Sequence, residues 1–61
     1  MSTTDEIQSE MEIYIAENEK FTVKGVKASA TRARKALQNL GKLIKTRRKE
    51  ILEEKAAASS N

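Results

Sequence analysis

The 61-residue chain contains no cysteine, no histidine and no proline, and only two glycines and two aromatic residues. Without cysteine it can form neither disulfides nor thiolate zinc sites, and without histidine it lacks the commonest metal ligand and general base. The scarcity of glycine, proline and aromatic residues is typical of helices. We therefore expect an all-α protein with no catalytic residues, no metal, no cofactor and no small-molecule substrate.

Long apolar runs are also missing, since no segment approaches the roughly 18–20 apolar residues that span a membrane. The first ten residues, MSTTDEIQSE, are acidic, whereas a secretory signal begins with basic residues. The lack of cysteine fits a reducing compartment. These observations predict a cytoplasmic protein that does not associate with membranes.

Acidic residues are absent from positions 20–49, although the chain contains nine of them. This segment holds eleven of the twelve basic residues, whereas residues 1–19 carry six acidic residues and no basic one. The net charge of +3 therefore conceals a strong separation of charge along the chain.

Apolar residues recur at steps of three and four in two segments, which predicts two amphipathic helices. We expect one domain in which these helices cover about 4–22 and about 27–55, with a break at about 23–26 and a frayed tail at 56–61. Two helices joined by so short a break form an antiparallel hairpin.

Both ends of the first helix carry sequence signals. Thr3 and Glu6 have the spacing of a capping box at its start. Gly25 suits the position after its end, because glycine adopts a positive φ without strain.

One apolar stripe on each helix is expected to be buried in the hairpin core or in a dimer interface. The stripe residues are Ile7, Met11, Tyr14, Phe21, Leu37, Leu40, Ile44 and Ile51. A core of this size rarely supplies more than about 5 kcal/mol, and disulfides and metals are excluded here. By elimination we predict a homodimer in which two hairpins form a four-helix bundle. Ile13 lies outside the stripe. Arg47 is expected to pair with an acidic residue near the N-terminus, such as Asp5 or Glu6, of the same chain or of the partner chain.

Basic residues occupy the side of the second helix opposite its apolar stripe, and no acidic residue precedes Glu50 there. A helix whose charges only keep a protein soluble normally mixes both signs. Like charges repel one another in the free protein, and the dense phosphates of duplex DNA relieve that repulsion and release counterions. We therefore predict sequence-independent, salt-sensitive DNA binding by Lys27, Arg32, Arg34, Lys35, Lys42, Lys45, Arg48 and Lys49.

The segment from Gly25 to Lys55 resembles the bacterial linker-histone-like nucleoproteins known best from chlamydiae. The matching residues are Gly25, Lys27, Ala28, Arg32, Arg34, Lys35, Leu37, Leu40, Leu43, Arg48, Lys49, Glu50 and Lys55. The resemblance implies a nucleoid-associated protein that binds DNA non-specifically and compacts it. The chlamydial proteins look as if they carry a long Lys/Ala-rich tail, whereas this sequence ends in AAASSN, so we do not expect compaction by such a tail.

Two other functions stay open from the residues alone. Asn18 and Arg47 are polar residues within apolar stripes, and such residues can determine register and partner choice. They favour a helical protein–protein interaction module with no nucleic-acid role. Phosphate contacts also do not distinguish DNA from RNA, and they leave open whether DNA is bridged, bent or compacted.

Overall fold

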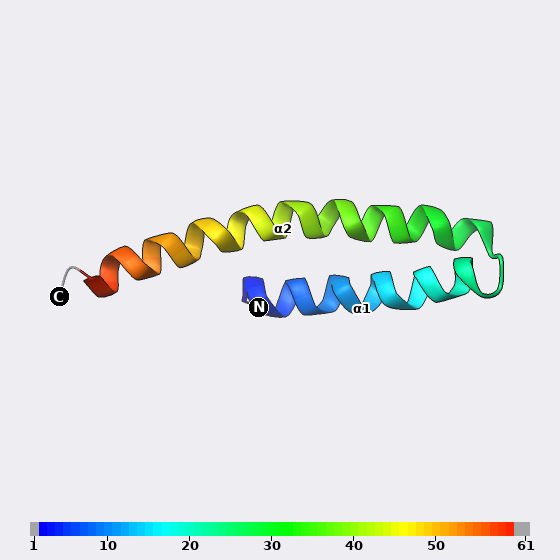
Figure 1. The fold of residues 1–61 in the computed structure, drawn as a ribbon, viewed down its shortest axis with the longest axis horizontal. Helices are drawn as coiled ribbons and strands as arrows, with labels where there is room; N and C mark the ends of the chain where they lie inside the picture. The colour runs from blue at the N-terminus through cyan, green and yellow to red at the C-terminus, as the bar shows by residue number, and fades with distance from the viewer. Residues whose placement is uncertain (1, 60–61) are drawn as a thin grey trace.

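The protein structure is a computed structural model that describes residues 2–59. Over this range the chain forms two helices, α1 (Thr3–Thr22) and α2 (Lys27–Ser59), and no strand. The helices run antiparallel and side by side, and α2 extends well beyond the start of α1 (Figure 1). The all-α helical hairpin predicted from the sequence is confirmed, whereas the four-helix bundle stays a prediction.

Helix α1 begins one residue earlier than its capping signal suggested. Ser2 is the N-cap, and its hydroxyl oxygen accepts a hydrogen bond from the backbone N–H of Asp5 at 3.1 Å. The expected capping box of Thr3 and Glu6 is therefore wrong. Thr3 is already helical, and its hydroxyl donates to a carboxylate oxygen of Glu50 at 2.8 Å. The Thr3 side chain, which the capping-box spacing assigned to the start of α1, thus bonds to Glu50 of α2 instead.

The turn between the helices depends on Gly25, whose φ is +70°. Its N–H donates to the carbonyl oxygen of Phe21 at 3.0 Å, and the N–H of Val26 donates to the carbonyl oxygen of Lys20 at 3.1 Å. A left-handed residue at this position satisfies carbonyl groups at the end of α1 and reverses the chain.

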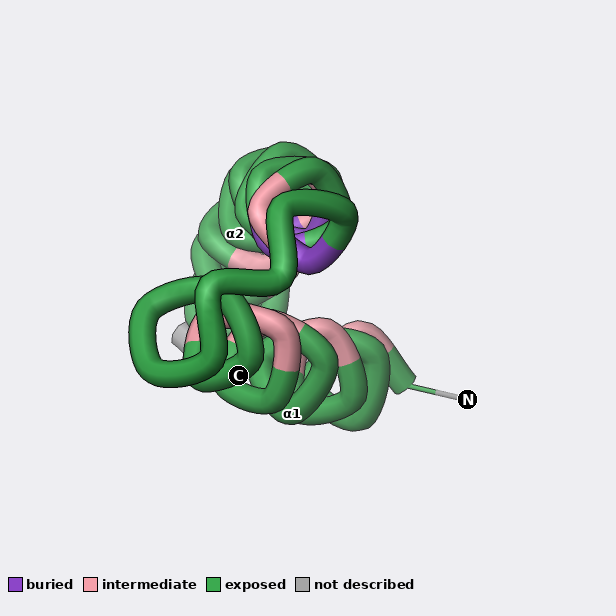
Figure 2. Tube along the Cα trace, turned by 90° about the vertical axis from the view of Figure 1, so that its right-hand side faces the viewer, coloured by how far each residue is buried: buried purple, intermediate pink, exposed green. Residues whose placement is uncertain are grey.

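The contact between the helices is built mainly from small residues of α2. Ser29, Ala33, Ala36 and Leu40 are buried and recur at steps of four, three and four. Seen along the hairpin, the buried segments of α2 face α1, which contributes only partly buried residues (Figure 2). The buried stripe of α2 is thus rotated by about one residue from the apolar stripe expected from the sequence.

The residues expected in the core or the dimer interface divide into three groups. Leu40 is buried, and Ile7 and Tyr14 are partly buried. The other five keep between 43% and 50% of their surface exposed: Met11, Phe21, Leu37, Ile44 and Ile51. The hairpin alone therefore buries little apolar surface, and the dimer role of these five residues stays a prediction.

Helix α2 continues four residues beyond its expected end at about 55. Its last turn contains Ala56, Ala57 and Ala58. Alanine has the highest helix propensity, which explains why residues 56–59, expected to fray, are helical. Residues 60–61 of that tail lie outside the described residues. Neither described helix is long and apolar enough to cross a lipid bilayer.

The two glycines should respond in opposite ways to replacement by alanine. A Cβ atom at Gly41 would meet open space, so Gly41→Ala should raise the free energy of unfolding by about 1 kcal/mol. Gly25→Ala should lower it by about 1–2 kcal/mol, because Cβ is strained at positive φ. Urea unfolding followed by circular dichroism measures both changes. A loss of stability in Gly41→Ala would indicate that another molecule contacts the backbone there.

Candidate nucleic-acid interface

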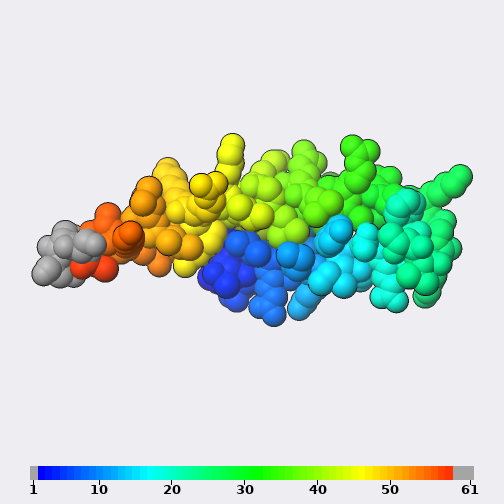
Figure 3. Space-filling view, viewed as in Figure 1, coloured from blue at the N-terminus to red at the C-terminus, as the bar shows by residue number. Residues whose placement is uncertain are grey.

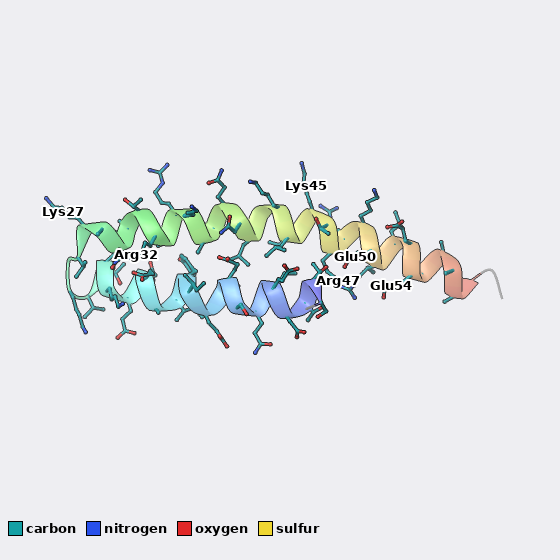
Figure 4. All side chains as sticks on the ribbon, turned by 180° about the vertical axis from the view of Figure 1, so that it is seen from behind. Lys27, Arg32, Lys45, Arg47, Glu50 and Glu54 are labelled. Atoms are coloured by element: carbon teal, nitrogen blue, oxygen red, sulfur yellow. The ribbon has the colours of Figure 1, made fainter. Side chains whose placement is uncertain are left out.

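The side of α2 that faces away from α1 is cationic along most of the helix. At about 100° per residue, seven basic residues lie within about 90° of the direction opposite the buried stripe. All seven are exposed: Lys27, Arg34, Lys35, Lys42, Lys45, Arg48 and Lys49. Lys27 and Lys45 visibly point away from α1 (Figure 4). We call these seven residues the cationic side.

Residues of the cationic side have no acidic partner in the described part of the chain. The ion pairs found between residues 2 and 59 involve Lys20, Arg32 and Arg47 and none of these seven residues. The acidic residues of α2 begin at Glu50, beyond the last cation of this side. Within the described residues, no ion pair therefore offsets the positive charge of the cationic side.

Arg32 differs from the other predicted DNA contacts because it belongs to the hairpin contact. Its Nε atom lies 3.0 Å from Oε1 of Glu17, and its Nη2 atom donates to Oγ of Ser29 at 3.1 Å. Ser29 is completely buried between these groups. The structure thus separates the eight predicted residues into seven free cations and one that pairs with α1.

The environment of Glu17 favours its ionised form. A hydrogen bond from Ser29 and the hydrogen bond and charge of Arg32 lower the pKa of Glu17, against the opposing effect of burial. Oε2 of Glu17 is nevertheless buried, and no hydrogen-bond partner lies within ordinary distance and angle of it among the described residues. A charged Glu17 in turn keeps Arg32 against α1 and away from the cationic side.

A second polar cluster closes the open end of the hairpin. Arg47 Nη1 lies 3.1 Å from Oε1 of Glu50 and 2.8 Å from Oε2 of Glu54, while Thr3 donates to the other oxygen of Glu50 (Figure 4). Hydrogen bonds from Thr3 and then Arg47 lower the pKa of Glu50, and those to Glu50 and Glu54 raise the pKa of Arg47.

Within one hairpin, the expected pairing of Arg47 with Asp5 or Glu6 is wrong. Glu50 and Glu54 are on the same helix as Arg47, three and seven residues further along, and therefore share its face. At this level α1 presents the hydroxyl of Thr3 to α2 and not a carboxylate.

Three cross-helix contacts at heptad spacing determine the register of the hairpin. They start from Thr3, Glu10 and Glu17, which bond to Glu50, Asn39 and Arg32. The Asn39 amide donates to Oε1 of Glu10 at 3.4 Å. From the sequence, Glu10 and Glu17 are expected to reach the bases beside the apolar stripe of the second helix, which are Lys27, Arg34 and Arg48. The structure pairs them with Asn39 and Arg32 instead.

One flank of the hairpin carries no charge along α1. Successive α1 residues on this flank are Thr4, Gln8, Met11, Ile15, Asn18 and Thr22. Leu37, Ile44 and Ile51 of α2 lie on the same flank, and each is about half exposed. We call these nine residues the neutral flank. The opposite flank holds Ile13 in a shallow hollow that is also lined by Glu10, Arg32, Lys35, Ala36 and Asn39.

Comparison with known families agrees with the cationic surface. A family model described as histone H1-like protein Hc1 matches residues 1–57, which is nearly the whole chain. The chain belongs to the Hc1 family. The match extends the resemblance seen at Gly25–Lys55 to the whole of α1, and it confirms that resemblance. Neither the curated proteins nor the solved structures contain a match to the chain.

Membership in the Hc1 family indicates a DNA-binding, architectural role. Histone H1-like families package DNA and are not known as enzymes. The family assignment does not identify which side chains contact DNA. The candidates are the seven residues of the cationic side, which form no ion pair among the described residues, whereas Arg32 and Arg47 are paired with carboxylates.

The carboxylates of the hairpin contact predict how stability depends on pH. Because the pKa values of Glu17 and Glu50 are lowered on folding, their contribution is complete above the unfolded value of about 4.3. It is lost as the pH falls through the folded-state values. The free energy of unfolding should therefore begin to fall near the unfolded pKa of about 4.3 and should continue to fall as the pH is lowered further. Urea titrations at several pH values measure this loss.

Glutamine variants distinguish the contribution of Glu17 and Glu50 to the pH dependence of stability from that of the other acidic residues. Glu17→Gln with Glu50→Gln should reduce the loss of stability on acidification. Glu12→Gln should leave it unchanged, because Glu12 is exposed and forms no ion pair within residues 2–59. An equal loss in the double variant and the parent would contradict this assignment.

Proposed function

We propose that the chain is a nucleoid-associated architectural protein that binds duplex DNA without sequence preference. The observation that carries the proposal is the cationic side of α2, seven exposed cations with no ion pair in the described chain. These side chains contact phosphates and release the counterions condensed on DNA. The charge of the cationic side favours a polyanion over a protein partner at this surface.

The hairpin supports this function by keeping acidic residues away from the cationic side. Glu10 and Glu17 are turned toward α2 at the helix contact, where Asn39 and Arg32 are their partners. Glu50 and Glu54 are occupied by Arg47. The outer surface of α2 is uncovered from the turn to the overhang, since α1 lies only beneath it (Figure 3).

We also propose that two hairpins pair through the neutral flank. The flank has about half-exposed apolar residues and no charge along α1, so a second copy can cover it without repulsion. The hairpin core is small, since the buried apolar residues among those described are only Ala33, Ala36 and Leu40. Pairing of two hairpins would bury more apolar surface and so stabilise the fold.

The charges of the helices favour one arrangement of this dimer. If α1 of each copy lies beside α2 of the other, acidic and basic helices are neighbours. Placing the two α2 helices side by side would bring like charges together. In the favoured arrangement the cationic sides face opposite directions, so a dimer bridges two duplexes.

Salt dependence tests the phosphate contacts. Affinity for two duplexes of unrelated sequence, measured by fluorescence anisotropy at several salt concentrations, should be equal and should fall steeply with salt. Lys42→Ala should reduce the slope of log affinity against log salt by about one. Arg32→Ala removes the same charge but should change the slope less, because Arg32 is held by Glu17.

Two results would contradict the proposed contacts. Absence of binding at about 50 mM salt would overturn DNA binding itself. Equal effects of Lys42→Ala and Arg32→Ala on the slope would show that the hairpin ion pair does not withhold Arg32 from DNA. Circular dichroism of each variant checks that the fold is retained.

Light scattering tests the proposed dimer. Ile44→Glu places a charge in the neutral flank and should convert the dimer to a monomer. Ile13→Glu is the matched control, because Ile13 and Ile44 are 47% and 49% exposed on opposite flanks. A monomeric parent protein, or equal dissociation in both variants, would overturn pairing through this flank.

A further inference from the structure

The exposed residues of α2 form three parallel columns at seven-residue spacing. One outer column contains Lys27, Arg34 and Arg48, with the uncharged Gly41 between the last two, and the other contains Lys35, Lys42 and Lys49. The middle column contains Thr31, Gln38 and Lys45. Two rows of cations therefore run along α2 on either side of a row that is mostly uncharged.

The surface between the two cation columns is hollowed. A shallow hollow is lined by Thr31, Arg34, Lys35, Leu37 and Gln38, and a second one further along α2 is lined by Lys45, Arg48, Lys49 and Leu52. The lining of each hollow includes a cation from both outer columns, Arg34 with Lys35 in the first and Arg48 with Lys49 in the second. This arrangement matches a ligand that has anions along two edges.

We propose that α2 lies in the major groove of duplex DNA, with the two outer columns on the phosphates of opposite strands and the middle column toward the groove floor. This inference rests on the proposed DNA binding and specifies its geometry. A helix with its side chains is about 10–12 Å across. The major groove of B-DNA is about 12 Å wide, whereas the minor groove is only about 6 Å wide.

The shape of the hairpin permits this placement. Helix α1 lies on the far side of α2 from the cation columns, so nothing in the described chain stands between α2 and the groove (Figure 3). Helix α2 also bows, with its convex side away from α1 (Figure 1). The convex side carries the columns, and its middle can therefore enter the groove before its ends meet the duplex.

The same geometry distinguishes DNA from double-stranded RNA. The major groove of A-form RNA is deep and too narrow for side chains to read. A helix that must insert between two strands therefore binds B-form DNA and is excluded from A-form RNA. Phosphate contacts from one face alone would not make this distinction, because both duplexes carry dense phosphate charge.

Groove-selective competition tests the placement with the full chain. A labelled DNA duplex is bound at low salt, and methyl green is then added as a major-groove ligand or netropsin as a minor-groove ligand. Methyl green should displace the protein, and netropsin should not. A duplex RNA of the same sequence should bind at least about tenfold more weakly at equal salt.

Paired variants test whether both columns contact phosphates. Arg34→Ala with Arg48→Ala, and Lys35→Ala with Lys49→Ala, each remove two charges from one column. Both pairs should reduce the salt slope by about two. Lys20→Ala with Lys24→Ala removes the same charge near the turn, away from both columns, and should leave the slope nearly unchanged.

The outcomes separate this proposal from the proposed function. Displacement by netropsin, equal affinity for duplex RNA, or a slope change confined to one column would overturn groove insertion while DNA binding stands. Complete absence of DNA binding would overturn both. Unchanged circular dichroism in the double variants ensures that the slopes report contacts and not folding.

Discussion

Two carboxylates that face the partner helix determine how this hairpin is assembled. Glu10 and Glu17 require polar partners, which Asn39 and Arg32 provide. To present them, α2 turns its small residues toward α1 and carries Leu37, Ile44 and Ile51 to the flank. The need of the Glu10 and Glu17 carboxylates for hydrogen-bond partners thus accounts for the small core, the neutral flank and the uncovered cationic side together.

The parts of the structure that follow from local patterns could be predicted from the sequence. The two helices and the all-α class come from apolar periodicity, and the cationic side comes from the lack of acids between residues 20 and 49. The rotation of α2 could not be predicted, because it depends on contacts between residues far apart in the chain. For the same reason Arg32 was counted as a free cation and Arg47 was assigned the wrong partners.

The surfaces of the hairpin point in different directions, which allows them to work at the same time. The neutral flank lies roughly at right angles to the cationic side, so pairing of two copies need not cover the cations. Under the proposed function, the few residues of this chain thereby provide both a self-association surface and a polyanion surface. Neither surface requires a pocket, a metal or a bound cofactor.

The uncompensated charge of α2 also links the stability of the free protein to ionic strength. Mutual repulsion among the seven free cations weakens the folded hairpin, and added salt screens it. Salt therefore strengthens the free fold while it weakens the complex with DNA. In the proposed complex, the phosphates of DNA replace dissolved ions in screening this repulsion, so DNA binding also stabilises the helix.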